Sequence, residues 1–247
     1  MIAHLGAVLR QRLKGLPRTP QQLNYSLQML SVMRSLGWHQ SIGEDRPIAS
    51  DGNPRPWYTY AALEWLVPRV KRTHQVFEFG GGYSTVWYGQ HAGQVITVEH
   101  NGAWLDQVRT MVGSNVTLLQ RDITGNEATS EGDSEYCTAI EAYPPKSFDI
   151  IVIDGMERVR CAQTAPSRLR DDGIIIFDNS DRIPFRPGID HLHSRGFGRI
   201  DFYGFVAQVG TLNCTSVFSK FGVTWATEAV PFVWRGGNDR LMMNKFE

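Results

Sequence analysis

Gln75-Val-Phe-Glu-Phe-Gly-Gly-Gly-Tyr-Ser-Thr-Val-Trp87 is the stretch that decides the fold of this chain. Its first residues predict a buried strand, which runs into three glycines and then into the start of a helix. These three parts together form a cradle for a nucleotide-like ligand, because the N–H groups of a helix N-terminus point at it. Gly80 and Gly82 would let the backbone approach the ligand without a Cβ clash, and Ser84 and Thr85 are candidate helix caps.

A carboxylate beside the glycines narrows the choice of ligand. Glu78 lies two residues before Gly80, where it would repel a pyrophosphate but suit a ligand with an ammonium, a sulfonium and a ribose. That ligand is S-adenosylmethionine. Glu99 ends the next predicted strand and is placed to accept both ribose hydroxyls. His100 is expected beside the adenine or ribose, and Asp122 is a candidate acceptor for the adenine amino group.

Composition bounds the class of protein. The chain has 247 residues, of which 42% are hydrophobic, enough for one large α/β domain with an extension. Twenty-five basic residues balance 25 acidic ones, so no positive field favours nucleic acid. The three cysteines have neither metal-ligand spacing nor the even number that a disulfide framework needs, and this favours a reducing compartment. We therefore expect a cytoplasmic protein without nucleic-acid or membrane partners. The oligomeric state is left open, a homodimer included.

Three zones follow one another along the chain. Residues 1–55 are polar and predict a helical extension or cap, residues 56–221 the ligand-binding domain, and residues 222–247 a tail that packs on the domain or on a partner. Within the extension, apolar residues at helical spacing predict an amphipathic helix that ends near Gly37: Leu23, Leu27, Leu30 and Met33.

Strands and helices alternate through the central zone. The expected strands are 76–79, 94–99, 116–120, 148–154, 173–178, 200–206 and 214–219. The expected helices are 60–67, 85–91, 103–112, 161–169 and 189–195, with a polar loop over 125–134. Five βα-type units followed by a terminal strand pair predict a doubly wound α/β sheet of Rossmann-like type. That sheet is expected to be mostly parallel, with one antiparallel edge strand.

A second group of polar residues ends the fourth and fifth predicted strands. Asp154, Asp178 and Asn179 are oxygen donors, and in an open α/β sheet such strand ends meet at the ligand edge. Mg²⁺ prefers oxygen ligands, so the three residues are candidate ligands of a metal that would activate an acceptor hydroxyl. The alternative is a metal-free cleft in which they bind the cosubstrate or cap helices. Arg158 and Arg160 follow within about one turn, where a structural ion pair is the simpler expectation.

The residues resemble those of class I S-adenosylmethionine-dependent methyltransferases over about residues 56–220. Glu78 through Gly82, with Gly81 at its centre, is similar to that family's first motif, and the closing strand pair is similar to its antiparallel hairpin. Asp154 with Asp178 and Asn179 is similar to the metal-ligand pattern of the catechol and caffeoyl-coenzyme-A O-methyltransferase branch. The set also resembles a little-characterised bacterial methyltransferase group. The resemblance implies S-adenosylmethionine as cosubstrate and Mg²⁺ as a candidate metal.

We therefore expect a transferase that moves a methyl group to oxygen or nitrogen of a small-molecule acceptor. Asp154, Asp178 and Asn179 would hold the acceptor or the metal, and Asp154 would also contact the cosubstrate. The alternatives are aminopropyl transfer on the same fold and a non-catalytic sensor domain that keeps the cleft. A nicotinamide-dependent oxidoreductase is disfavoured by Glu78 and by the missing third spaced glycine.

Overall fold

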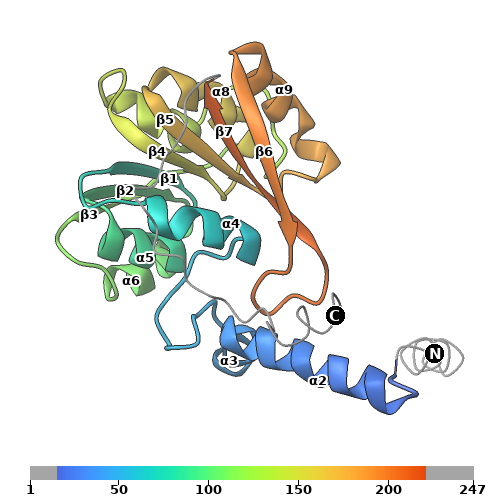
Figure 1. Ribbon diagram of the computed structural model, residues 1–247. Helices are drawn as coiled ribbons and strands as arrows, with labels where there is room; N and C mark the ends of the chain where they lie inside the picture. Colours follow the sequence, from blue (N-terminus) through green and yellow to red (C-terminus); the bar gives the residue numbers. More distant parts are fainter. Residues whose placement is uncertain (1–15, 221–247) are drawn as a thin grey trace, which may run out of the picture.

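A seven-stranded mixed sheet forms the centre of the protein (Figure 1). The structure is a computed structural model and describes residues 16–220. The strands lie in the order β3-β2-β1-β4-β5-β7-β6. Their bounds are β1 Gln75–Phe79, β2 Gln94–Glu99, β3 Val116–Gln120, β4 Phe148–Ile153, β5 Leu169–Asp178, β6 Phe197–Gly204 and β7 Asn213–Lys220. The predicted mixed α/β sheet of Rossmann-like type is confirmed, and its antiparallel strand is β7, which lies between β5 and β6.

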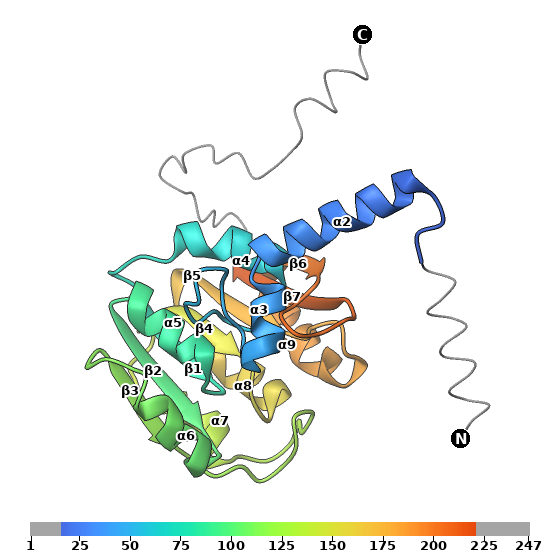
Figure 2. The ribbon, with the colours of Figure 1, turned by 90° about the horizontal axis from the view of Figure 1, so that it is seen from below.

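Helices cover both faces of this sheet (Figures 1 and 2). The helices are α2 Pro20–Ser35, α3 Trp38–Glu44, α4 Tyr60–Leu66, α5 Tyr83–His91, α6 Gly102–Arg109, α7 Glu135–Thr138, α8 Arg158–Thr164 and α9 Arg186–Ser194. Short 3₁₀ turns cover Val67–Arg69, Ala139–Ala142, Ala165–Ser167 and Ile183–Phe185. Because side chains alternate along a strand, β4 sends Ile151 and Ile153 to the face of α7–α9 and Ile150 and Val152 to the face of α4 and α5. The central strands are buried on both sides, as the uninterrupted apolar runs of β4 and β5 predict.

The amino-terminal extension differs from its prediction. The predicted amphipathic helix is α2, and Thr19 caps it by accepting from the Gln22 N–H. Only Met33 of this helix is buried, while Leu23, Leu27 and Leu30 are about half exposed. Helix α2 therefore projects from the domain instead of packing on it (Figure 1). The expected tail over 222–247 lies outside the described residues.

The chain between α3 and α4 runs back to the sheet. Gly37, with φ of 85°, turns the backbone from α2 into α3. The Ser41 hydroxyl then donates to the Ile48 carbonyl and accepts from its N–H, which holds the returning segment. Helix α3 lies at the end of the sheet where the β6–β7 turn also lies (Figure 1).

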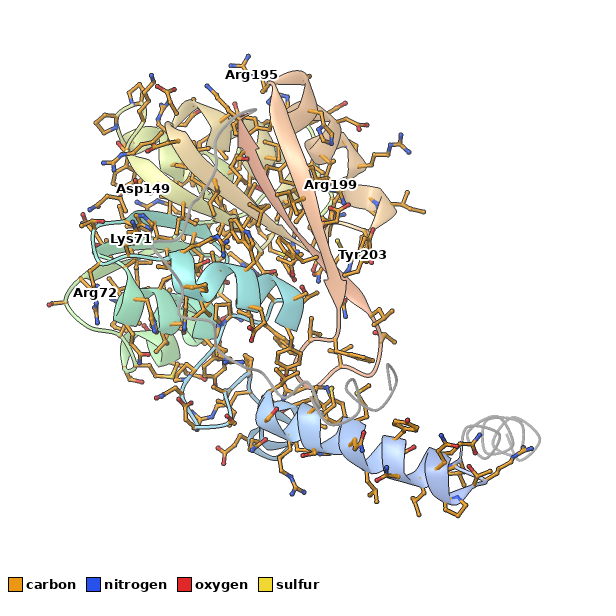
Figure 3. The ribbon with its side chains drawn as sticks, viewed as in Figure 1. Lys71, Arg72, Asp149, Arg195, Arg199 and Tyr203 are labelled. Carbon is orange, nitrogen blue, oxygen red and sulfur yellow. The ribbon has the colours of Figure 1, made fainter. Side chains whose placement is uncertain are left out.

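Ion pairs lie at the opposite end of the sheet, where the parallel strands begin. Lys71 and Asp149 mark that end in Figure 3. Asp149 accepts from the Gln75 N–H at 2.7 Å and pairs with Arg170, also at 2.7 Å. Asp149 therefore joins the starts of β1, β4 and β5, and the residues that carry chemistry are to be sought at the other edge.

Candidate functional site

A cleft of about 680 Å³ lies at the carboxyl ends of the parallel strands. That volume falls within the range of small-molecule sites, and this edge is where open α/β sheets bind their ligands. The described residues that line it follow the carboxyl ends of β1, β2, β4 and β5 or belong to other connecting segments. They include Gly80–Ser84, Glu99, His100, Trp104, Asp154–Met156, Arg158, Asp178 and Asn179.

Gly80 serves backbone packing more than ligand approach. Its φ is 95°, a region that L side chains rarely adopt. A Cβ at Gly80 would lie 2.6 Å from the Gly155 Cα, and a Cβ at Gly155 would lie 2.7 Å from the Gly80 Cα. The ends of β1 and β4 therefore meet backbone against backbone. Gly80 also lines the cleft, so its expected approach to a ligand stays a prediction.

Gly81 and Gly82 have different requirements. A Cβ on Gly81 would come within 2.9 Å of the Thr97 methyl group, so the protein itself leaves no room there. Gly82 has an extended φ of 178°, and the nearest atoms to an added Cβ would be those of the Trp104 indole at 3.7 Å. Trp104 Nε1 donates to the Gly81 carbonyl at 2.6 Å and fixes the loop. The protein itself therefore has room for a side chain at Gly82. A ligand that lay against this loop would compete for the same space.

Glu78 is fully buried and does not line the cleft. Its Oε2 accepts from Thr85 Oγ1 at 2.5 Å and from Thr97 Oγ1 at 2.9 Å. Its Oε1 is buried and lacks a hydrogen-bond partner within residues 16–220. Burial raises the pKa of Glu78 to about 7, against the opposing effect of nearby hydroxyl groups. The carboxyl group thus lies beneath the glycine loop, and the cleft-lining Ser84 is among the hydroxyl residues that act on its pKa.

Glu99 lines the cleft and orders the loop that follows β2. Its Oε2 accepts from the Gly81 N–H at 3.1 Å. Its Oε1 accepts from the N–H groups of His100 and Asn101 at 2.9 and 2.8 Å, and His100 Nδ1 lies 2.7 Å away. The carboxylate is therefore held rigidly at the edge of the cleft. Oε1 is fully engaged by these neighbours, whereas Oε2 accepts from the Gly81 N–H alone among the described residues and keeps one lone pair for a ligand hydroxyl.

The remaining predicted cosubstrate contacts differ in whether they line the cleft. Ser84 lines the cleft at the start of α5, as expected. Thr85 is fully buried, and its hydroxyl accepts from the Gly82 N–H at 3.0 Å, so it caps the helix as predicted and lies behind the loop. Asp122 is exposed and does not line the cleft, because the chain after β3 turns away towards α7, where the Asp122 carbonyl accepts from the Tyr136 N–H.

Asp154, Asp178 and Asn179 do meet at the ends of β4 and β5. Asp178 is buried; its Oδ1 accepts from Thr215 Oγ1 at 2.5 Å and its Oδ2 from Asn179 Nδ2 at 2.7 Å. Burial and the nearby Asp154 charge raise the pKa of Asp178 to about 8. Burial likewise raises the pKa of Asp154, although Arg158 opposes it. Perturbed carboxyl groups in a cleft are typical of functional sites.

The donor set does not fit the predicted Mg²⁺. Arg158 Nη2 pairs with Asp154 Oδ1 at 3.2 Å, and Arg158 Nη1 donates to Asn179 Oδ1 at 3.2 Å. A guanidinium thus holds the oxygens that a metal would need. Nor does any group of three or more His, Cys, Asp or Glu suited to a metal occur in the part of the chain that is described.

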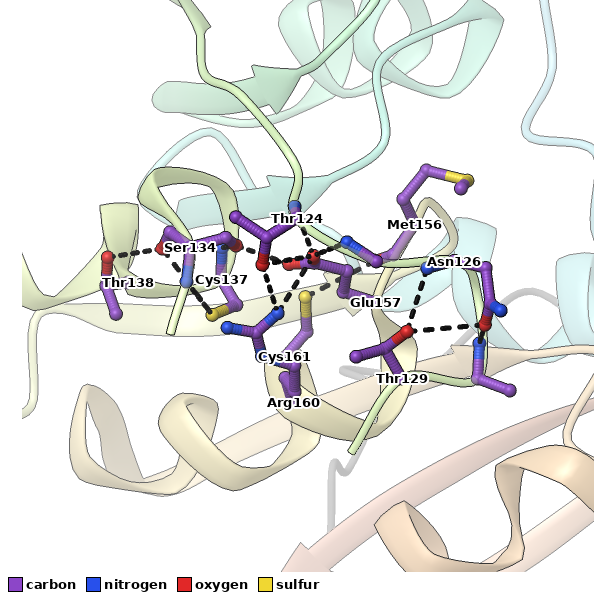
Figure 4. Close-up of polar contacts among 12 residues, drawn as sticks. Thr124, Asn126, Thr129, Ser134, Cys137, Thr138, Met156, Glu157, Arg160 and Cys161 are labelled. Carbon is purple, nitrogen blue, oxygen red and sulfur yellow. Dashed lines mark hydrogen bonds and ion pairs between the residues drawn. The ribbon is translucent and has the colours of Figure 1, made fainter. Parts of the chain in front are cut away.

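A second ion pair, which the sequence did not predict, holds the loop over 124–134 (Figure 4). Glu157 is fully buried, and its Oε1 accepts from Arg160 Nη1 at 2.9 Å and from the N–H groups of Thr124 and Gly125, each at 2.8 Å. Its Oε2 accepts from the Ser134 hydroxyl. Arg160 is therefore part of a structural pair, as expected. Its partner gave no sequence signal, since Glu157 lies in the turn after β4 and takes a left-handed φ of 48°.

The far wall of the cleft comes from segments with little sequence pattern. Asp45 and Trp57 belong to the amino-terminal extension and the start of the domain, and both contact the β6–β7 turn. Trp57 Nε1 donates to the Ala207 carbonyl at 2.7 Å, and Gln208 Nε2 donates to Asp45 Oδ1 at 3.1 Å. Pro47, Glu127, Arg182, Val206, Val209 and Asn213 complete this side.

Five carboxylates and two guanidinium groups line the cleft among the described residues. The acidic residues are Asp45, Glu99, Glu127, Asp154 and Asp178, and the basic ones are Arg158 and Arg182. Arg182 lies 3.5 Å from Glu127, and Arg158 is bound to Asp154. The surplus of carboxylates attracts a cation and opposes a polyphosphate.

Comparison with known proteins gives matches among solved structures alone, since no family model and no curated protein matches the chain. A precorrin-6y C5,15-methyltransferase from Geobacter metallireducens is 13% identical over 65% of this chain and 88% of that one, with a TM-score of 0.47. A spermidine synthase from Thermotoga maritima is 15% identical over 67% of this chain and 60% of that one, also with a TM-score of 0.47.

A methyltransferase-like protein from Silicibacter pomeroyi is similar as well. It is 22% identical over 68% of this chain and 90% of its own, with a TM-score of 0.45. The fold itself is assigned from the strand order, in which antiparallel β7 is inserted between β5 and β6. That closing strand pair is the feature by which the sequence resembles class I methyltransferases, and at the level of the fold the resemblance is confirmed.

Proposed function

We propose that this chain is a methyltransferase that uses S-adenosylmethionine and acts on oxygen or nitrogen of a small-molecule acceptor. The carrying observation is a glycine cradle at the carboxyl edge of the sheet that opens into a cleft with a surplus of carboxylates. A sulfonium and an ammonium suit that charge, whereas the pyrophosphate of a dinucleotide does not.

The residues would divide the cosubstrate between them. Glu99 would accept from the ribose hydroxyls, with His100 beside it, and Gly82 would leave room for the ligand against the backbone. Glu78 would face the methionine ammonium through one water at its unpartnered Oε1. Because the sulfonium is already a good leaving group, positioning and proton removal are the main demands on the protein.

The transfer itself is an in-line displacement. The acceptor lone pair attacks the methyl carbon, the electron pair of the C–S bond remains on sulfur, and the proton of the acceptor passes to a base. Asp154 is the carboxylate best placed for that role, because it lines the cleft and its burial raises its pKa above the ordinary value.

The same charge pattern supports a second candidate, aminopropyl transfer to an amine. A polyamine acceptor would also be drawn to Asp45, Glu127, Asp154 and Asp178. The two reactions leave different products, S-adenosylhomocysteine after methyl transfer and 5′-methylthioadenosine after aminopropyl transfer from the decarboxylated cosubstrate.

Mass spectrometry of these products tests the proposal. The protein is incubated with each cosubstrate and with panels of phenols, carboxylates and amines. We expect S-adenosylhomocysteine to form with at least one acceptor, at a rate that falls in Asp154→Asn. Formation of 5′-methylthioadenosine alone would replace the proposal by the second candidate, and cosubstrate binding without product from any acceptor would indicate a sensor domain.

A further inference from the structure

The guanidinium of Arg158 lies among the three residues that the sequence predicts as metal ligands. Nη2 pairs with Asp154 Oδ1 at 3.2 Å, and Nη1 donates to Asn179 Oδ1 at 3.2 Å and to the Asp178 carbonyl at 2.7 Å. Nε donates to the Gly155 carbonyl at 2.9 Å. One positive charge thus joins the end of β4 to the end of β5.

This arginine is built into the site. Its side chain is 7% exposed, and its Cζ lies 5.1 Å from the centre of the Phe185 ring. Its backbone N–H donates to the Glu127 carbonyl at 2.9 Å, which fixes the first residue of α8 against the loop over the cleft. Four of its five N–H groups have acceptors, so the guanidinium has little freedom to leave.

A divalent ion and this guanidinium would compete for the same oxygens. A metal must approach its ligands to between about 2.0 and 2.6 Å, and Asp154 Oδ1 and Asn179 Oδ1 already accept from Arg158. Both carboxylate oxygens of Asp178 accept from other donors, Thr215 and Asn179. Placing the ion there would also set two cations side by side in a buried site, which is costly.

We propose that Arg158 takes the place of the divalent cation in this cleft, so that Asp154 is positioned by a guanidinium and the site needs no metal. Arg158 acts as a positioning residue: it pairs with Oδ1 of Asp154, which lines the cleft, and leaves the second carboxylate oxygen without a hydrogen bond among the described residues. On the proposed function, that oxygen receives the proton of the acceptor as the methyl–oxygen or methyl–nitrogen bond forms.

Mn²⁺ is the probe, because its electron paramagnetic resonance signal distinguishes free from bound ion without any turnover. The full-length wild-type protein is expected to leave added Mn²⁺ free, and millimolar Mg²⁺ is expected to leave its melting temperature unchanged. Arg158→Ala removes the internal cation and frees the oxygens, so its Mn²⁺ dissociation constant should fall by roughly tenfold or more against the wild type. Arg158→Lys, which keeps a charge, should resemble the wild type.

Arg182→Ala is the matched control, since it removes the other arginine of the cleft and leaves Asp154 and Arg158 paired. It should gain no Mn²⁺ binding. Mn²⁺ bound by the wild type and lost in Asp154→Asn would overturn the proposal, even if Arg158→Ala does not fold. So would a folded Arg158→Ala that binds no more Mn²⁺ than the wild type. None of these readouts depends on methyl transfer, so a failure of this proposal can be distinguished from a failure of the proposed function.

Discussion

Alanine at Gly80 and alanine at Gly82 should have opposite consequences, although the two glycines are neighbours in one loop. At Gly80 the new Cβ would lie 2.6 to 2.8 Å from backbone atoms of Gly155 and Asp154, at a φ of 95°. The left-handed backbone costs about 1–2 kcal/mol, and backbone overlap costs about 1–3 kcal/mol. We expect Gly80→Ala to lose about 3 kcal/mol of unfolding free energy, or roughly 6–12 °C in melting temperature for a chain of this size.

At Gly82 the backbone is extended, and the nearest atoms to an added Cβ are those of Trp104 at 3.7 Å. The folded protein accepts this methyl group, so the stability of Gly82→Ala should stay within about 1 kcal/mol of the wild type. The methyl group would nevertheless take space from a ligand in the cradle. We expect S-adenosylmethionine to bind about tenfold more weakly or worse, a loss of about 1.4 kcal/mol or more.

Thermal unfolding and titration calorimetry on the two variants provide the assay. The wild type sets both reference values, and each variant is the control for the other. The reasoning is refuted if Gly80→Ala has the same melting temperature as the wild type. It is also refuted if Gly82→Ala is stable and binds S-adenosylmethionine with unchanged affinity, because Gly82 would then not face the ligand.

Three further predictions concern buried and titrating carboxyl groups. Glu157→Gln leaves Arg160 buried without a counter-charge and should cost about 3–5 kcal/mol in chemical denaturation; an unchanged midpoint would show that the pair is dispensable. Glu78 has a folded-state pKa of about 7 against an ordinary 4.5, so the stability it contributes is present below pH 4.5 and is lost as pH rises through 7. Between pH 5 and pH 8 the wild type should therefore lose roughly 3 kcal/mol relative to Glu78→Gln in urea unfolding, and parallel curves would contradict this. Asp154→Asn should reduce turnover strongly while cosubstrate affinity stays within about threefold, under 1 kcal/mol, and equal turnover would remove Asp154 as the base.

Two of the strands could be predicted to the residue. β2 and β3 have the expected bounds, because each is a short run rich in β-branched and other apolar residues, with a polar residue at its carboxyl end. β5 begins at Leu169, four residues before its predicted start, since charged Arg170, Asp171 and Asp172 form an irregular first part that does not read as a buried strand. Helix α3 was not predicted. It is held by the left-handed backbone of Gly37 and by the hydrogen bonds of Ser41, and neither feature produces a hydrophobic period in the sequence.

The sequence predicts where the candidate site lies better than it predicts what each residue does there. The rule that ligands bind at the carboxyl ends of strands correctly brought Glu99, Asp154 and Asp178 to one cleft. It could not show that Glu78 lies beneath the glycine loop, since burial of a strand-end carboxylate depends on Thr85 and Thr97 from other elements.

The close approach of Gly80 to Gly155 and the reach of Arg158 across two strand ends also depend on distant segments. No local pattern in either segment encodes such contacts. The wall formed by the β6–β7 turn was missed for the same reason.

Titration calorimetry with S-adenosylmethionine, beside NAD, tests the central claim most directly. The account predicts that the wild type binds S-adenosylmethionine and gives no signal with NAD. Glu99→Ala should weaken S-adenosylmethionine binding by roughly 10- to 100-fold, because hydrogen bonds to a charged carboxylate are lost. Tight binding of NAD with no signal from S-adenosylmethionine would contradict the account.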